Sequence, residues 1–178
     1  MKVLIKAGGN VNQARTTDGA SPLFMASQEG NVATMKVLIK AGGNVNQART
    51  TDGVSPLFIA SEKGNIDTVK VLLEAGGNVN QANNTGSTPL YMASQGGHTD
   101  IVAILLGAPG IQINQPQIDE SNALLMAALK GHVEVVRLLL QQPNIELNKK
   151  SYGKSPLGWA TESNHTEIIQ LLTDAGAQ

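Results

Sequence analysis

The chain has 178 residues, of which 41% are hydrophobic but only 3% aromatic, and its formal net charge at pH 7 is −1. That charge argues against a general nucleic-acid or membrane-surface binder, which needs a basic excess. The absence of cysteine excludes disulfides, thiol nucleophiles and thiolate metal sites, and no apolar run is long enough to cross a membrane. We therefore expect a soluble, intracellular protein, cytoplasmic or nuclear, with a core of aliphatic side chains.

The opening segment Met1–Gly19 recurs unchanged at Met35–Gly53. A lysine interrupts its apolar run far short of a signal-peptide core, so the segment is structural sequence. It is typical of the latter part of a helix, a glycine stop and a loop. At Met35 this piece follows a first helix, predicted over Ser21–Glu29, which has no counterpart before Met1. We therefore predict a truncated array in which Met1–Ala7 is frayed or held by another molecule, whereas Met35–Ala41 is firmly helical.

The rest of the chain repeats one unit with a period of 33 or 34 residues. Stretches related to "SPLFMAS" begin at Ser21, Ser55, Thr88, Asn122 and Ser155. A second anchor, the asparagine of "NVN" and its relatives, stands at Asn12, Asn46, Asn80, Asn114 and Asn148. This periodicity predicts one array, with a partial leading repeat at residues 1–11 and further repeats at 12–45, 46–79, 80–113, 114–147 and 148–178.

Each unit is predicted to form two short helices and a hairpin-like loop. In the second unit, Ser55 can cap a helix that begins with Pro56, and Gly64 can end it in a left-handed conformation. A second helix follows with apolar residues at three- to four-residue spacing, and the pair Asp52–Gly53 favours a tight turn in the preceding loop. Helices of about two turns are too short to be stable alone. They must therefore bury their apolar faces on the next unit, which makes the array a solenoid.

The unit resembles the ankyrin repeat, whose pattern T-P-L-H-x-A, G-H, V-x-x-L-L and A-x-V-N it follows five times in succession. One departure is that the histidine after Pro-Leu is replaced, so apolar contact should take the place of a hydrogen bond between repeats. The replacements are Phe24, Phe58, Tyr91, Leu125 and Gly158. The first two repeats also carry one extra residue in the loop "QARTTDG". The resemblance implies an all-α ankyrin solenoid of five repeats plus a partial N-terminal one.

Several residues are of types that could form catalytic, metal or modification sites. His98, His132 and His165 occupy the same position of successive repeats, where helix spacing of about 8–10 Å keeps them from sharing one zinc ion, so a structural role is expected. No phosphate loop, nucleophile elbow or carboxylate couple stands out. We expect no enzymatic activity, no cofactor and no metal. In the family, the asparagine closing a repeat is sometimes hydroxylated. Asn46 and Asn80 are the closest positions here, and the alternative is that their amides brace the hairpin.

The resemblance implies a non-catalytic scaffold that binds a partner protein through its hairpin tips and the inner faces of the first helices. The near-identical first two repeats differ at positions that match the family's variable contacts, such as Ala20/Val54 and Glu29/Lys63. The residues predicted to contact a partner are Arg15, Thr17, Ala20, Gln28, Glu29, Arg49, Thr51, Val54, Glu62, Lys63, Tyr91, Gln95, Ile118, Leu125, Leu129, Lys130, Tyr152 and Lys154.

The fourth repeat gives the sharpest candidate within this set, because Ile118, Leu125 and Leu129 place apolar residues at positions expected to be exposed. The alternative is that Ile118 and Leu125 tuck under a loop remodelled by Glu120, which replaces the usual turn glycine. Trp159 aligns with a buried first-helix position and is predicted to be core filler.

Two other functions stay open at this stage. The chain could be a targeting module cut from a longer protein that carries an enzymatic domain elsewhere. It could also bind a small, nucleotide-like ligand on its inner face, although the few positive charges there argue against this. For the chain itself we expect a monomer that binds neither nucleic acid nor membrane, with end-to-end contact through the uncapped N-terminus as the alternative.

Overall fold

The structure is a computed structural model that describes residues 9–178, and within that range it contains ten helices. They are α2 (Pro22–Gln28), α3 (Val32–Lys40), α4 (Pro56–Glu62), α5 (Ile66–Glu74), α6 (Pro89–Gln95), α7 (Thr99–Leu106), α8 (Ala123–Lys130), α9 (Val133–Leu140), α10 (Pro156–Glu162) and α11 (Thr166–Asp174). The predicted all-α fold of paired helices is confirmed. The prediction for Met1–Ala7 falls outside the described residues, whereas Met35–Lys40 is helical as expected and Ala41 is its C-cap.

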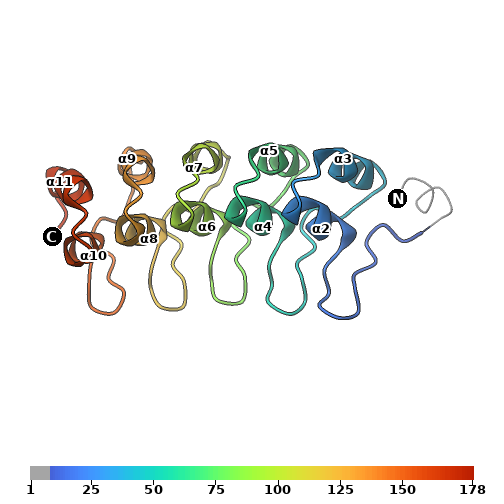
Figure 1. Cartoon of the computed structure of the whole chain (residues 1–178), viewed down its shortest axis with the longest axis horizontal. Coiled ribbons are helices and arrows are strands. Elements are labelled where there is room, and N and C mark those ends of the chain that lie inside the picture. Colours follow the sequence, from blue (N-terminus) through green and yellow to red (C-terminus); the bar gives the residue numbers. More distant parts are fainter. Residues whose placement is uncertain (1–8) are drawn as a thin grey trace.

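The helices stack in two rows, and the loops project on one side (Figure 1). The first helix of each pair (α2, α4, α6, α8, α10) lies between the row of second helices (α3, α5, α7, α9, α11) and the projecting loops. Each first helix packs on its own second helix and on the first helices of the neighbouring pairs. Because successive pairs supply the contacts, the molecule is a solenoid whose stability depends on the coupling between neighbours.

The helix ends follow the predicted capping. The backbone N–H of Phe58 donates to Ser55 Oγ at 3.1 Å, and Pro56 occupies the first turn of α4. Gly64 follows the C-cap of α4 with a φ of +74°, a conformation that would strain any residue with a side chain. Repeat-equivalent caps begin the other first helices, at Ser21, Thr88, Asn122 and Ser155. Short helices can therefore begin and end at fixed positions, which gives every unit the same register.

The core runs the length of the stack. One leucine from each of the first four first helices is at most 1% exposed, and these are Leu23, Leu57, Leu90 and Leu124. A second, smaller cluster lies on the hairpin side of the first two repeats and contains Ala20, Phe24, Val54, Phe58 and Ile59. Phe24 and Phe58 thus supply the apolar contact that was predicted where the family carries histidine. Within residues 9–178, none of the helices combines the length and apolar character needed to cross a membrane.

Candidate functional site

Five hairpin tips, at residues 15–20, 49–54, 83–87, 117–121 and 151–154, form the projecting row. In each tip the first residue donates its backbone N–H to the carbonyl of the last, as Arg15 does to Ala20 at 2.9 Å. The enclosed loops have four residues in the first two tips, three in the next two and two in the last. The extra residue predicted for the first two repeats is confirmed, and the shorter fifth tip was not foreseen.

Ion pairs hold the first two tips in shape. Arg15 Nε donates to Asp18 Oδ1 and Arg49 Nε donates to Asp52 Oδ1, each at 3.0 Å. The hydrogen bond from Arg49 lowers the pKa of Asp52, and the guanidinium carbon of Arg49 also lies 4.8 Å from the ring centroid of Phe24. These exposed pairs add little to the free energy of folding. Their charges are already matched, so the first two tips carry no net charge toward a partner.

Four of the residues predicted to contact a partner are buried, so their side chains cannot do so in this conformation. Ala20 is 1% exposed, Val54 and Tyr91 are 4% exposed, and Leu125 is 2% exposed. Tyr91 is buried because the following repeat covers it. The Tyr91 hydroxyl lies 3.2 Å from Ser121 Oγ, on the next hairpin tip. Burial raises the pKa of Tyr91, which keeps its hydroxyl neutral.

Ile118 and Tyr152 have the opposite environment, with 76% and 81% of their surfaces exposed. In the described part of the chain they are the large hydrophobic residues that stand out into solvent, and they lie on adjacent tips. Each of the two predictions for the fourth repeat therefore holds for one residue. Ile118 is exposed, as a contact residue should be, and Leu125 is buried, as the alternative predicted. Leu129 is half-buried at the end of α8, beside the exposed Lys130.

The other predicted contact residues remain accessible to different degrees. The exposed ones are Arg15, Thr17, Glu29, Thr51 and Lys63, and the half-buried ones are Gln28, Arg49, Glu62, Gln95 and Lys154. They come from the hairpin tips and from the C-terminal ends of the first helices. The structure therefore leaves an accessible strip on the hairpin side of the stack.

The prediction that Trp159 fills the core is wrong. Its side chain is half-buried, its indole N–H donates to the carbonyl of Ser151 at 3.3 Å, and Lys154 Nζ lies 4.6 Å from its ring centroid. Equivalent residues such as Met25 and Met92 are half-buried too. The aligned position therefore borders the accessible strip, and the indole braces the base of the fifth tip.

The three histidines are structural, as predicted, and they link successive repeats. His98, His132 and His165 place Nε2 at 3.0, 2.9 and 3.1 Å from a carbonyl oxygen at the end of the preceding first helix. Asn65 takes the same position and donates Nδ2 to the carbonyl of Ser27 at 3.0 Å. Over residues 9–178, no three histidine or acidic side chains gather in a way that could hold a metal ion.

The asparagines that begin the repeats have a bracing role, but each joins the loop after one second helix to the loop after the next second helix instead of bracing one hairpin. Asn80 Nδ2 donates to the carbonyl of Gly110 at 2.8 Å, and Asn80 Oδ1 accepts from the backbone N–H of Gln112 at 2.9 Å. Asn46 makes the corresponding pair of bonds to Gly76 and Asn78. Sequence reasoning missed this direction because the partners lie 30 and 32 residues downstream.

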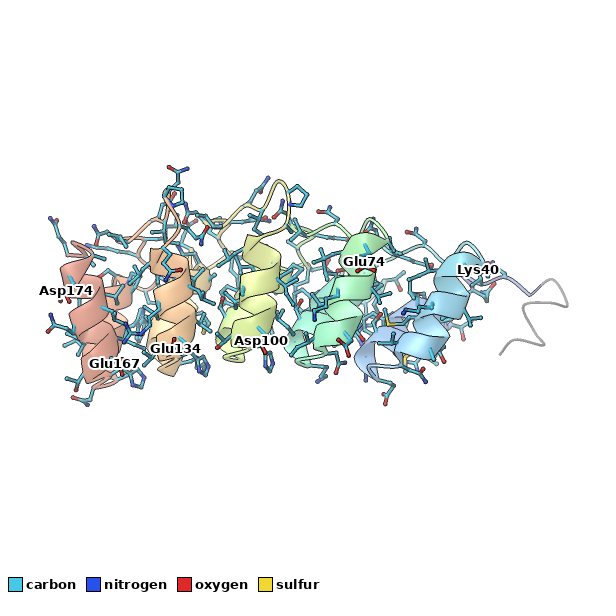
Figure 2. All side chains as sticks on the ribbon, turned by 90° about the horizontal axis from the view of Figure 1, so that it is seen from above. Lys40, Glu74, Asp100, Glu134, Glu167 and Asp174 are labelled. Atoms are coloured by element: carbon cyan, nitrogen blue, oxygen red, sulfur yellow. The ribbon has the colours of Figure 1, made fainter. Side chains whose placement is uncertain are left out.

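The row of second helices presents a different surface. Figure 2 shows Asp100, Glu134 and Glu167 along one edge of this outer face, in the first turns of α7, α9 and α11. Carboxylates there stabilise the positive ends of the helix dipoles. Lys40 and Glu74 lie toward the opposite edge. The carboxylates in these first turns therefore have a structural explanation, which sets them apart from the charged residues on the hairpin side.

The comparisons with known proteins agree with this geometry. A family model described as "Ankyrin repeats (3 copies)" matches residues 1–83, 41–117 and 110–178, which together span the whole chain. A search of curated proteins gives no match. The stacked helix pairs, the projecting hairpins and the family match lead to the same conclusion: this chain belongs to the ankyrin repeat family.

Proposed function

We propose that the chain is a non-catalytic scaffold that binds a partner protein along the hairpin side of the stack. Ankyrin repeats are in general protein–protein interaction modules. The observation that carries the proposal here is the exposure of Ile118 and Tyr152 on adjacent hairpin tips. Large apolar side chains surrounded by polar ones are typical of the residues that dominate binding energy in protein interfaces.

The contact surface that we propose runs from these two tips onto the end of α8. Leu129 is half-buried there and sits next to the exposed Lys130, so an apolar residue again has a charged neighbour. Toward the N-terminal half, the exposed residues Thr17, Glu29 and Lys63 provide polar contacts at the rim. Rim contacts of this kind exclude water from an interface and set its orientation more than its affinity.

The test uses the immobilised chain in lysate of the native cells, with quantitative mass spectrometry of what it retains. The double variant Leu129→Asp, Tyr152→Ala should lose a partner that the wild type retains. A matched control, Lys36→Glu on the outer face, should keep it. The affinity of the purified partner is then measured by calorimetry. Retention that is equal on wild type and double variant would contradict the proposed surface.

A further inference from the structure

The hairpins differ in net charge as well as in exposed apolar surface. Each of the first two carries one arginine and one aspartate, and residues 81–87 of the third carry no charge. Residues 115–121 of the fourth carry Asp119 and Glu120, a net charge of −2, and residues 149–154 of the fifth carry three lysines, a net charge of +3. Net charge is thus concentrated on the same two hairpins that expose Ile118 and Tyr152.

Tyr152 occupies a backbone conformation that its residue type disfavours. Its φ is 50° and that of Gly153 is 78°, so both central residues of this two-residue loop are left-handed. Ser151 and Lys154 close the loop with two backbone hydrogen bonds of 3.1 Å. Such loops favour asparagine or aspartate before glycine. Tyrosine in this position is strained relative to a right-handed conformation, and strain of this kind is concentrated at functional sites.

Packing of the Tyr152 ring within the fold does not offset this backbone strain. The side chain is 81% exposed, so intramolecular packing does not account for a tyrosine here. An asparagine would satisfy the same turn without the bulky ring. The residue is therefore explained better by contact with another molecule than by stability.

Two of the three lysines of this hairpin are matched by carboxylates. Lys149 pairs with Glu120 of the fourth hairpin, which joins the two charged hairpins, and Lys154 pairs with Glu162 at the end of α10. Lys150 is exposed and makes no salt bridge within residues 9–178. Tyr152 thus stands at the tip of a braced hairpin, two residues from an exposed lysine whose charge is not matched within the described residues.

From this arrangement we propose that the fifth hairpin is a recognition element that inserts Tyr152 into an apolar pocket of a partner protein with a carboxylate at the rim of that pocket. The carboxylate would pair with Lys150, which fixes the orientation of the ring. The proposal rests on the proposed function and adds the chemistry of the partner. A nucleic acid fits less well, because holding phosphates takes several basic contacts, whereas among the described residues of this hairpin only Lys150 is left without a carboxylate partner.

The test separates binding from folding with one substitution. Tyr152→Asn removes the ring but suits the left-handed turn, so the thermal midpoint should rise by about 2–4 °C while binding falls. Lys150→Glu reverses one lysine of the hairpin, and Lys36→Glu makes the same charge change on α3 as a control. The probe is a displayed library of random short peptides, selected on the wild-type chain. Fluorescent oligodeoxythymidine and phosphatidylserine vesicles are tested alongside it.

We expect the selected peptides to combine Asp or Glu with Leu, Phe or Tyr. Their affinity should fall at least about tenfold for Tyr152→Asn and for Lys150→Glu, with no change for Lys36→Glu. It should also weaken when the salt is raised from about 0.15 to about 0.5 M.

Other outcomes would overturn the proposal. If peptides bind Tyr152→Asn as well as the wild type but lose affinity for Leu129→Asp, the fifth hairpin is not the recognition element, while the proposed function stands. If no peptide binds the wild-type chain, the proposal for this hairpin fails, and retention of a partner from lysate decides the proposed function separately. Binding of oligodeoxythymidine or vesicles that depends on Tyr152 would assign the hairpin to nucleic acid or membrane.

Discussion

Replacing Asn80 with alanine should uncouple the loop that follows α5 from the loop that follows α7. The side chain makes two hydrogen bonds to the second of these loops, one from Nδ2 to the carbonyl of Gly110 and one from the N–H of Gln112 to Oδ1. Alanine removes both, whereas the backbone N–H of Asn80 keeps its own bond to Asn78 Oδ1 at 3.0 Å. The substitution therefore removes a contact between successive loops and leaves the local turn in place.

The expected size follows from counting these bonds. One intramolecular hydrogen bond contributes about 1 kcal/mol net, so the substitution Asn80→Ala should lower the free energy of unfolding by about 2 kcal/mol. The matched control is Asn148→Ala at the C-terminal end of the stack. The Asn148 side chain accepts a single hydrogen bond from a residue 30 positions downstream, the N–H of Gln178 at 2.7 Å, and its loss should lower the free energy of unfolding by about 1 kcal/mol.

Urea denaturation followed by circular dichroism measures this difference. With a slope of about 2 kcal/mol per molar urea, the midpoint should fall by about 1 M for Asn80→Ala and by about half as much for Asn148→Ala. The transition of Asn80→Ala should also broaden, because weaker coupling between neighbours lowers cooperativity. Equal midpoints for the two variants, with unchanged steepness, would refute the reasoning that these asparagines join successive loops of the stack.

Three further predictions follow from the same packing. Leu124→Ala removes a side chain that is 0% exposed and should lower the free energy of unfolding by about 3 kcal/mol, whereas Leu157→Ala, at a half-buried position, should lower it clearly less. Equal losses of this free energy in urea denaturation would contradict the stacked core. His132→Ala removes a bond to the preceding repeat and should cost about 1 kcal/mol, and an unchanged midpoint would show the bond to be unimportant. The hydrogen bond from Arg49 lowers the pKa of Asp52, so the charged carboxylate stabilises the fold above its unfolded pKa of about 3.9, and this stabilisation is lost as the pH falls through the lower folded value. Asp52→Asn should therefore lower the free energy of unfolding at neutral pH and lose this effect in acid. A stability difference between variant and wild type that does not depend on pH would contradict the pair with Arg49.

The fold could be predicted from the sequence because residues within each unit mark where its helices begin and end. Ser55 and Pro56 fix where α4 begins, and Gly64 fixes where its last turn ends. Those signals are local, so they can be recognised without knowing what lies beside the unit. The period of 33 or 34 residues then shows that the unit recurs.

The candidate surface was harder to predict because burial depends on the following repeat. Tyr91 and Leu125 occupy a position where the family carries a polar residue, which favoured exposure, yet the next hairpin covers Tyr91 through Ser121. Trp159 was misplaced because its aligned position was taken to be buried in every repeat. Ile59 is 6% exposed, but Met25, Met92 and Met126 are half-buried, as Trp159 is. Helical periodicity identifies the face of a helix, but it does not show how far a neighbouring loop extends over it.

The left-handed turn at Tyr152 could have been suspected from the sequence. "SYGK" places glycine after tyrosine between two polar residues, which is a hairpin signal with an unusual first residue. The shortness of the fifth tip depends on its closing hydrogen bonds, which sequence reasoning did not resolve. The exposure of the ring follows from that shortness.

Amide chemical-shift mapping by NMR tests the central claim most directly, with a peptide selected on the wild-type chain or an isolated partner as the titrant. We predict that the chemical shifts which change on binding lie in residues 115–121, residues 149–154 and the end of α8, and that the shifts of the outer helices α3, α5, α7, α9 and α11 stay unchanged. Changes concentrated on the outer helices, with the hairpins unaffected, would contradict the claim that this protein binds its partner on the hairpin side.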